Sequence, residues 1–316
     1  MRVAAIDCGT NSLRLLVADV DPVTGTLEDI TREMVVVRLG EGVDRTGLFA
    51  PEALERTFAT VDAYAETCAR LGADAIRFVA TSASRDAANS DLLVAGVERR
   101  LGVVPEVISG EEEARLSFRG ATGALARGLD APFLVVDLGG GSTELVLGTR
   151  EPEHVHSMNV GCIRLAERHL SAEPTGAGEI DLAVRDIREA LDAAAKDVPF
   201  ARTGTLVGVS GTVTTVTAHV LGLDAYRPER IDGSILAIDD VVAAGDELLV
   251  MSRAARAALP FMHPGRVDSI GAGALVWREV MLRVRREVED AGGSLDSVVT
   301  SEHDILDGIA LGLAPA

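Results

Sequence analysis

Lysine and aromatic residues are almost missing from this sequence of 316 residues. Lys196 is the only lysine, and it stands in an Ala-Ala-Lys-Asp context. A Walker A loop ends in Gly-Lys-Ser or Gly-Lys-Thr, so the sequence excludes a P-loop nucleotidase. Aromatic residues make up 3% of the chain. Its hydrophobic cores must therefore be built mainly from Val, Leu, Ile and Ala.

Cysteine is scarce, and positive charge is outweighed by negative charge. The cysteines are Cys8, Cys68 and Cys162, which are not spaced as zinc ligands and suit a reducing cytoplasm. The formal net charge is −19, which argues against nucleic-acid or anionic-membrane partners because both require a basic surface. We also expect no signal peptide, and no apolar run approaches the roughly 20 residues of a membrane span.

Apolar and turn-forming segments alternate along the chain as in an α/β protein. Strands are expected at 2–8, 13–20, 35–39, 75–81, 103–109, 133–137, 143–147, 155–160, 205–209 and 297–300. Helices are expected at 51–71, 85–101, 111–124, 177–196, 211–222, 239–258, 267–290 and 303–313. The length exceeds that of a typical single domain. We therefore expect one domain at 1–125 with the C-terminal segment 303–316, and a second at 126–302.

One motif occurs twice in the sequence. Asp7-Cys-Gly-Thr-Asn-Ser-Leu-Arg14 recurs as Asp137-Leu-Gly-Gly-Gly-Ser-Thr-Glu144, which aligns Asp7 with Asp137 and Arg14 with Glu144. In both copies the Gly-rich turn runs into an apolar segment rather than a helix start, which predicts two β-hairpins. Self-similarity of this kind indicates two related domains that face each other.

Each of the two turns combines glycines with a carboxylate. Glycine allows positive φ angles and lets backbone N–H groups come close to an anion. A carboxylate beside such a turn suits a phosphate held jointly by the backbone and hydrated Mg²⁺. An ordinary tight hairpin is the alternative for a single copy, but two copies that share Asp, Gly and Ser favour phosphate binding.

These two motifs resemble the two phosphate loops of the actin-like ATPase superfamily. Further segments are similar to signatures of its exopolyphosphatase/guanosine-pentaphosphatase family: Ala80-Thr-Ser-Ala-Ser-Arg-Asp86, Ile108-Ser-Gly-Glu-Glu-Glu-Ala-Arg115, Gly208-Val-Ser-Gly-Thr-Val-Thr-Thr215 and Ser301-Glu-His-Asp-Ile-Leu-Asp-Gly308. The resemblance covers the chain from end to end and is to the short, two-domain form of the family. It implies an α/β fold of two related actin-like (ribonuclease H-like) domains, with mixed sheets flanking a central phosphate-binding cleft.

The resemblance also implies the catalytic and metal-binding residues. Glu113 corresponds to the family's glutamate that activates the attacking water. The alternative, a glutamate cluster favoured by the dipole at a helix start, is preferred for Glu111 and Glu112. Asp137 and Glu144 correspond to the Mg²⁺ ligands, with Mn²⁺ as an alternative metal. Asp7 would bind the metal through water or only orient the first loop.

The substrate phosphates are expected to contact both loops and two further residues. The implied phosphate-binding residues are Gly9, Thr10, Asn11, Ser12, Arg85, Gly139, Gly140, Gly141, Ser142, Thr143 and Gly211. The planar fork of Arg85 matches phosphate oxygens, although a surface ion pair with Asp86 is the alternative. Gly211 would allow a close approach of the backbone to substrate, whereas Ser210 or Thr212 could simply cap the helix that follows.

The expected activity is that of an exopolyphosphatase, which releases terminal orthophosphate from inorganic polyphosphate by Mg²⁺-dependent attack of water. The nearest alternative is hydrolysis of the 5′ phosphate of guanosine pentaphosphate. An ATP-using protein of the actin or sugar-kinase type fits the Glu-Glu-Ala-Arg signature less well, and a non-catalytic polyphosphate-binding regulator ranks below both. We expect a cytoplasmic protein with no nucleic-acid or membrane partner. A homodimer is expected because family relatives often pair.

Overall fold

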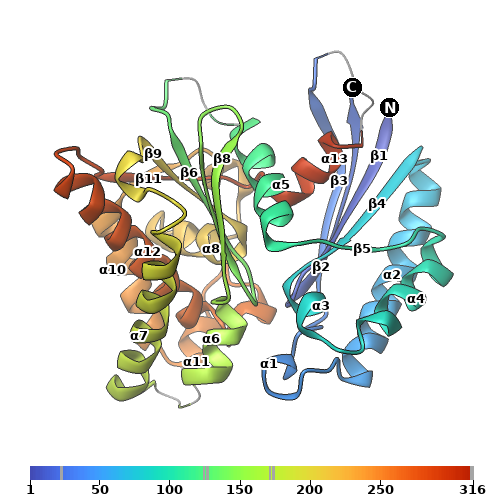
Figure 1. Cartoon of the computed structure of the whole chain (residues 1–316). Coiled ribbons are helices and arrows are strands. Elements are labelled where there is room, and N and C mark those ends of the chain that lie inside the picture. The colour runs from blue at the N-terminus through green and yellow to red at the C-terminus, as the bar shows by residue number, and fades with distance from the viewer. Residues whose placement is uncertain (22–23, 124, 126–127, 171, 173–174, 314–316) are drawn as a thin grey trace. The chain divides into compact units, whose positions relative to one another are not determined.

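The computed structural model describes residues 1–21, 24–123, 125, 128–170, 172 and 175–313 (Figure 1). The chain divides into two compact units, Met1–Gly120 with Ile305–Ala316 and Ala121–Asp304. The sequence placed these boundaries a few residues away, at 125/126 and 302/303. Residue 126 lies outside the described residues.

A mixed five-stranded sheet forms the centre of the first unit. Its strands are β1 (Arg2–Cys8), β2 (Ser12–Val20), β3 (Leu27–Val36), β4 (Ala75–Ala80) and β5 (Glu106–Val107). Their order is β3-β2-β1-β4-β5. β1 pairs antiparallel with β2 and parallel with β4, so the expected hairpin after β1 is confirmed.

Helices cover both faces of this sheet. They are α2 (Pro51–Leu71) and α4 (Ser90–Leu101) on one face, and α5 (Gly110–Gly123) and α13 (Ile305–Leu311) on the other (Figure 1). Because side chains alternate along a strand, Ala4 and Ile6 pack in the cluster with α2 and α4. Val3 and Ala5 pack in the cluster with α5 and α13. β1 is therefore buried on both sides, and its carboxyl end is held firmly.

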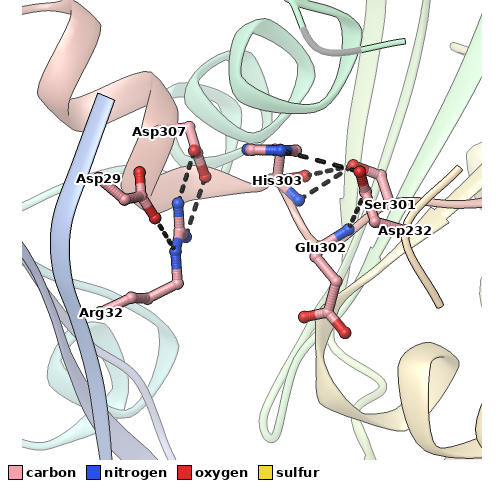
Figure 2. A network of polar contacts seen from close by, with 7 residues as sticks. All are labelled: Asp29, Arg32, Asp232, Ser301, Glu302, His303 and Asp307. Carbon is pink, nitrogen blue, oxygen red and sulfur yellow. Dashed lines mark hydrogen bonds and ion pairs between the residues drawn. The ribbon is translucent and has the colours of Figure 1, made fainter. Parts of the chain in front are cut away.

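The C-terminal helix α13 is fixed to the first unit by an ion pair and a close backbone contact. Arg32 on β3 donates to both carboxylate oxygens of Asp307 on α13, at 2.7 and 3.2 Å, and also to Asp29 (Figure 2). At Gly308 an added Cβ would lie 2.1 Å from the backbone oxygen of Leu116. Only glycine lets α13 pack this closely against α5.

A mixed six-stranded sheet forms the centre of the second unit. Its strands are β6 (Phe133–Leu138), β7 (Thr143–Gly148), β8 (Pro152–Met158), β9 (Thr205–Val209), β10 (Ile235–Ala237) and β11 (Ser297–Thr300). Their order is β10-β11-β9-β6-β7-β8. Read from β8, the order β8-β7-β6-β9-β11 has the connectivity of β3-β2-β1-β4-β5. The sequence repeat therefore corresponds to a repeat of the fold, with β10 added at one edge.

The helices of the second unit pack around a large apolar core. They are α6 (Cys162–His169), α7 (Ala177–Ala194), α8 (Ser210–Val220), α9 (Pro228–Ile231), α10 (Ile238–Val250), α11 (Arg253–Ala257) and α12 (Ile270–Asp290). Trp277 of α12 is 1% exposed. An added Cβ at Gly208 of β9 would lie 2.7 Å from its ring. Gly208 thus lets α12 pack directly on the sheet.

Several expected elements differ from those observed. The strand expected at 35–39 lies at Leu27–Val36 instead. β3 is an edge strand with mostly exposed or half-buried side chains, so it lacks the apolar pattern of a buried strand. The strand expected at 103–109 is reduced to Glu106–Val107.

Two expected helices are each divided. The helix expected at 85–101 consists of α3 (Ser82–Asp86) and α4, and the one expected at 239–258 consists of α10 and α11. Ser252 begins α11 as an N-cap that accepts a hydrogen bond from the Ala255 backbone, which is the local reason for the second break. The helix expected at 111–124 is observed at Gly110–Gly123, and residue 124 lies outside the described part. Within that part, no helix is both long and apolar enough to cross a membrane.

Candidate active site

The first hairpin places Asp7 directly opposite Arg14. The Arg14 Nε and Nη2 groups donate to Asp7 Oδ2 at 2.9 and 2.7 Å. Asp7 is buried, with 5% of its surface exposed. The turn between the strands is closed by a hydrogen bond from Gly9 N to Ser12 O, 3.0 Å long. The first loop thus starts beside an ion pair whose carboxylate is buried.

The second hairpin has the same turn but a different pair of side chains. Gly139 N donates to Ser142 O at 3.0 Å, and Asp137 lies directly opposite Glu144. Both carboxylates are buried, at 6% and 1% exposure, and Ser157 Oγ donates to Glu144 Oε1 at 2.7 Å. Two neighbouring carboxylates repel each other unless a cation or a proton lies between them.

These two carboxylates fit a divalent metal ion. Mg²⁺ prefers oxygen ligands and is commonly held by one or two carboxylates, with water and substrate phosphates completing its coordination. Within the described ranges, no group of three or more His, Cys, Asp or Glu side chains is placed to hold a metal. A metal at Asp137 and Glu144 would therefore take most of its ligands from water or substrate.

The carbonyl groups of the first loop are hydrogen-bonded within the first unit. Thr10 O accepts from Gly40 N at 2.8 Å. Asn11 O accepts from Val37 N at 3.0 Å and from Arg38 N at 2.8 Å. Because these carbonyls are occupied, the N–H groups of the turn are the backbone atoms suited to an anion.

Three buried polar side-chain atoms of the first unit have no hydrogen-bond partner among the described residues. They are Thr10 Oγ1, Asn11 Oδ1 and Ser84 Oγ. An added Cβ at Gly40 would lie 2.3 Å from Thr10 Cγ2 and 3.2 Å from the Ala83 Cβ, so the first loop and the start of α3 meet at Gly40. Buried polar atoms are rarely left unsatisfied. Their grouping indicates that a ligand or water forms hydrogen bonds with these atoms. Sequence analysis does not single out Ser84.

Arg85 and Glu113, both predicted site residues, form an ion pair. Arg85 Nη1 lies 2.7 Å from Glu113 Oε2 and 3.1 Å from Ile108 O. The alternative expected from the sequence, a pair between Arg85 and Asp86, is not the one that forms. Nε and Nη2 of Arg85 have no hydrogen-bond partner in the part of the chain described. Glu113 is 8% exposed, so its carboxylate is buried but charge-compensated.

The other two glutamates at the start of α5 have different surroundings. Glu112 lies 2.8 Å from Arg77 of β4, and its backbone N–H donates to Ser109 Oγ. Glu111 is exposed. Acidic residues in a first turn are favoured by the helix dipole, and this account is sufficient for both.

The carboxyl end of β9 lies beside Asp137 in the second unit. Val209 is the register partner of Asp137, and Ser210 follows it with a φ angle of 78°. An added Cβ at Gly211 would lie 2.2 Å from Arg266 Nη2, and Arg266 Nη1 donates to Thr215 Oγ1 at 3.1 Å. Glycine at 211 therefore makes room for a guanidinium group. Arg266 was not expected at this place, because no sequence pattern marks it.

A second carboxyl group lies at the end of the neighbouring strand β11. Glu302 Oε1 accepts a hydrogen bond from Tyr226 OH at 2.6 Å, and the Glu302 backbone N–H donates to Asp232 (Figure 2). Burial is the largest cause that raises the pKa of Glu302 above its ordinary value, while the Tyr226 hydrogen bond and Arg266 act against it. Sequence analysis marks Glu302 only as part of the signature at 301–308.

The sequence of the chain is similar to those of known proteins over almost its full length. Residues 16–306 match the model of the Ppx/GppA phosphatase family. The chain is 48% identical to Exopolyphosphatase 2 of Mycobacterium tuberculosis over 320 residues, which covers 99% of this chain and 98% of that protein.

Solved structures agree with this match. A crystal structure of an exopolyphosphatase-like protein is 46% identical, with a TM-score of 0.96 over 99% of this chain and 97% of that one. The Aquifex aeolicus PPX-GPPA enzyme is 26% identical, with a TM-score of 0.79 and 99% of each chain covered. These likenesses confirm the expected fold class, an α/β fold of two actin-like domains with mixed sheets.

Proposed function

The chain belongs to the Ppx/GppA phosphatase family, and on that premise we propose that it is an exopolyphosphatase. Such an enzyme is a phosphoanhydride hydrolase that releases terminal orthophosphate from inorganic polyphosphate. The observation that carries the proposal is the ion pair of the half-buried Arg85 and the buried Glu113, 2.7 Å apart. It combines a carboxylate that can accept a proton with a guanidinium that can bind phosphate. The full-length similarity to Exopolyphosphatase 2 supports the same substrate.

Glu113 is the general base of this proposal. Hydrolysis of a phosphoanhydride requires a positioned water and neutralisation of charge, and little covalent chemistry from the protein. Glu113 orients the water and takes its proton as the water oxygen bonds to the terminal phosphorus. The bond from that phosphorus to the bridging oxygen breaks, and the shortened chain leaves as an anion. Arg85 fixes Glu113 through Nη1, and its remaining N–H groups bind oxygens of the terminal phosphate.

The two hairpin turns bind the substrate phosphates. In the first unit the contacts come from Gly9, Thr10, Asn11 and Ser12. The unsatisfied side-chain oxygens of Thr10 and Asn11 support this role. In the second unit they come from the turn 139–143, that is, Gly139, Gly140, Gly141, Ser142 and Thr143. Gly211, at the start of α8, contributes a backbone contact to the substrate near the carboxyl end of β9, which lies beside Asp137.

Asp137 and Glu144 hold Mg²⁺ in this proposal, with Mn²⁺ as the alternative. When bound, the ion neutralises phosphate charge and polarises the phosphoryl oxygens. The chain contributes the two buried carboxylates and Ser157, which orients Glu144. Asp7 remains a proposed ligand through water. Asp7 Oδ2 already accepts two hydrogen bonds from Arg14. Asp7 therefore also has a second proposed role, which is to orient the first loop.

We also propose a cytoplasmic location and a homodimer. The location is supported by three cysteines that are all free and buried in the structure, as is usual in a reducing compartment. The dimer rests on the family resemblance alone. Size-exclusion chromatography with light scattering distinguishes a dimer from a monomer directly.

Phosphate release from medium-length polyphosphate tests the proposed activity. The wild type and the variants Glu113→Gln and Glu111→Gln are compared with Mg²⁺ and with a chelator. We expect kcat of Glu113→Gln to fall by about 10²- to 10⁴-fold, with little change in KM, and Glu111→Gln to behave as wild type. A Glu113→Gln variant as fast as wild type would contradict the role of Glu113.

The substrate is tested with guanosine pentaphosphate in the same assay. We expect a higher kcat/KM for polyphosphate than for the nucleotide. The reverse preference would show that the protein is a guanosine-pentaphosphate phosphohydrolase. ATP-dependent phosphorylation of a sugar would instead indicate the kinase class.

A further inference from the structure

The start of helix α6 braces the second phosphate loop. Cys162 N donates to Gly139 O at 3.0 Å, and Ile163 N donates to Gly140 O at 2.8 Å. Gly161 precedes the helix, and an added Cβ there would lie 2.5 Å from Gly140 O. The loop and the helix start are therefore packed backbone against backbone.

The carbonyl of Gly141 in this loop is held by a side chain. Arg164 Nε donates to Gly141 O at 2.7 Å. Glycine peptides rotate with little steric penalty, so the peptide after Gly141 could turn its oxygen toward a bound phosphate. A carbonyl oxygen carries partial negative charge and would repel the phosphate, whereas an N–H group in the same place attracts it.

The first loop indicates why this carbonyl needs a partner. Asn11 is the residue that aligns with Gly141 in the sequence repeat. Its carbonyl accepts from Val37 N and Arg38 N, so two backbone groups do in the first repeat what Arg164 does in the second. Both copies of the loop keep the same carbonyl occupied, by different means.

We propose that Arg164 is a positioning residue for the second phosphate loop: it keeps the Gly141 carbonyl turned away from the substrate, so that the loop presents N–H groups to a phosphate. The inference rests on the proposed function insofar as this loop binds phosphate. Arg164 acts through Gly141 and does not itself need to touch the substrate.

Binding of inorganic phosphate, measured by calorimetry with Mg²⁺ present, tests this role without turnover. Arg164→Gln is expected to bind phosphate about three- to tenfold more weakly, the effect of one lost hydrogen bond. Its KM for polyphosphate should rise by the same factor with a smaller change in kcat. Arg164→Lys should be intermediate, because an ammonium group can donate one bond to the same carbonyl.

Arg168→Gln is the matched control. Arg168 lies one turn further along α6 and pairs with Asp186 at 3.4 Å, so its loss should leave phosphate affinity unchanged. Hydrogen exchange of a peptide that covers 138–144 should be faster in Arg164→Gln than in Arg168→Gln. A merely structural role would lower the melting temperature and leave phosphate affinity unchanged among the folded molecules.

The inference is overturned if folded Arg164→Gln binds phosphate as wild type does, or if Arg168→Gln loses as much affinity. It is also overturned if the wild type binds no phosphate. A wild type that binds phosphate but releases none from polyphosphate would contradict the proposed function. In that case the affinities of the two variants still decide the role of Arg164.

Discussion

Asp137 and Glu144 are register partners on β6 and β7, at the positions that Asp7 and Arg14 occupy on β1 and β2. In the first repeat the positive charge belongs to the chain, because Arg14 pairs with Asp7 at 2.7 Å. In the second repeat two carboxylates share the place, and their mutual repulsion favours a bound cation. The first hairpin therefore carries an ion pair at this position and the second carries two carboxylates. We expect the metal at the second hairpin.

Loss of the Ser157 hydroxyl should weaken metal binding. Ser157 Oγ donates to Glu144 Oε1 at 2.7 Å and so fixes the direction of that carboxylate. Removing such a supporting group typically weakens a metal site by about 10- to 100-fold. We expect Ser157→Ala to lower Mn²⁺ affinity by about tenfold, measured by electron paramagnetic resonance titration without substrate. Ser294→Ala, at an exposed loop serine, is the control, and equal affinities for the two variants would contradict the assignment.

Arg85 and Arg77 offer a matched comparison. Each lies near the start of α5 and pairs with a glutamate there, Arg85 with Glu113 at 2.7 Å and Arg77 with Glu112 at 2.8 Å. Only Arg85 is assigned to phosphate. We expect Arg85→Ala to lower kcat/KM by about a hundredfold, as for the loss of one group that stabilises transition-state charge.

Arg77→Ala should retain activity and lose stability only. Steady-state kinetics on polyphosphate and thermal melting of both variants separate the two effects. If both variants lose activity equally, the Arg85 pair has no special role.

The sequence predicted the hairpins and part of the site because these depend on local patterns. Asp7 and Asp137 mark the repeat, and the family signatures identify Arg85 and Glu113. The ion pair between these last two joins residues 28 positions apart, and no local pattern predicts it. Ser157 and Arg164 were missed for the same reason: their partners are carboxylate or carbonyl groups that only the folded chain brings near.

The errors in the fold also have a physical cause. β3 is an edge strand with few buried side chains, so its apolar pattern is weak and its position was mistaken. α6 was not expected, because an eight-residue amphipathic helix such as Cys162–His169 gives a short periodic signal. That helix is nevertheless the one that braces the second loop.

The three thiols should be unreactive in the native protein. Burial raises the pKa values of Cys8 and Cys162 and raises the pKa of Cys68 to about 11. At about pH 8 these thiols are therefore protonated, and the thiolate is the reactive form. We expect iodoacetamide to leave native activity unchanged and to label all three cysteines after denaturation. Rapid inactivation would mean that a thiol takes part in the reaction.

The ion pair between Arg32 and Asp307 should contribute to the docking of α13. Asp307 is 3% exposed, and removal of Arg32 leaves its carboxylate with fewer partners. We expect Arg32→Gln to lower the free energy of unfolding by about 1–3 kcal/mol.

Asp29→Asn is the control for Arg32→Gln, because it breaks only the more exposed contact of Arg32. Its effect should stay below about 1 kcal/mol. Urea denaturation at neutral pH measures both values. Equal losses would show that Asp307 does not depend on Arg32.

Glu302 makes the free energy of unfolding depend on pH, and the sign of this dependence follows from the burial of its carboxyl group. Its pKa in the folded protein is raised above the ordinary value of 4.5, with burial as the largest cause. The unfolded chain therefore releases this proton first as the pH rises, and stability falls between 4.5 and the higher folded pKa. Glu302→Gln removes this effect while its amide oxygen can still accept from Tyr226. We expect the variant to be more stable than wild type at neutral and alkaline pH, and the difference to vanish toward the ordinary pKa. Urea denaturation across this range measures it; a difference that is the same at every pH would mean that Glu302 does not titrate differently in the folded and unfolded states.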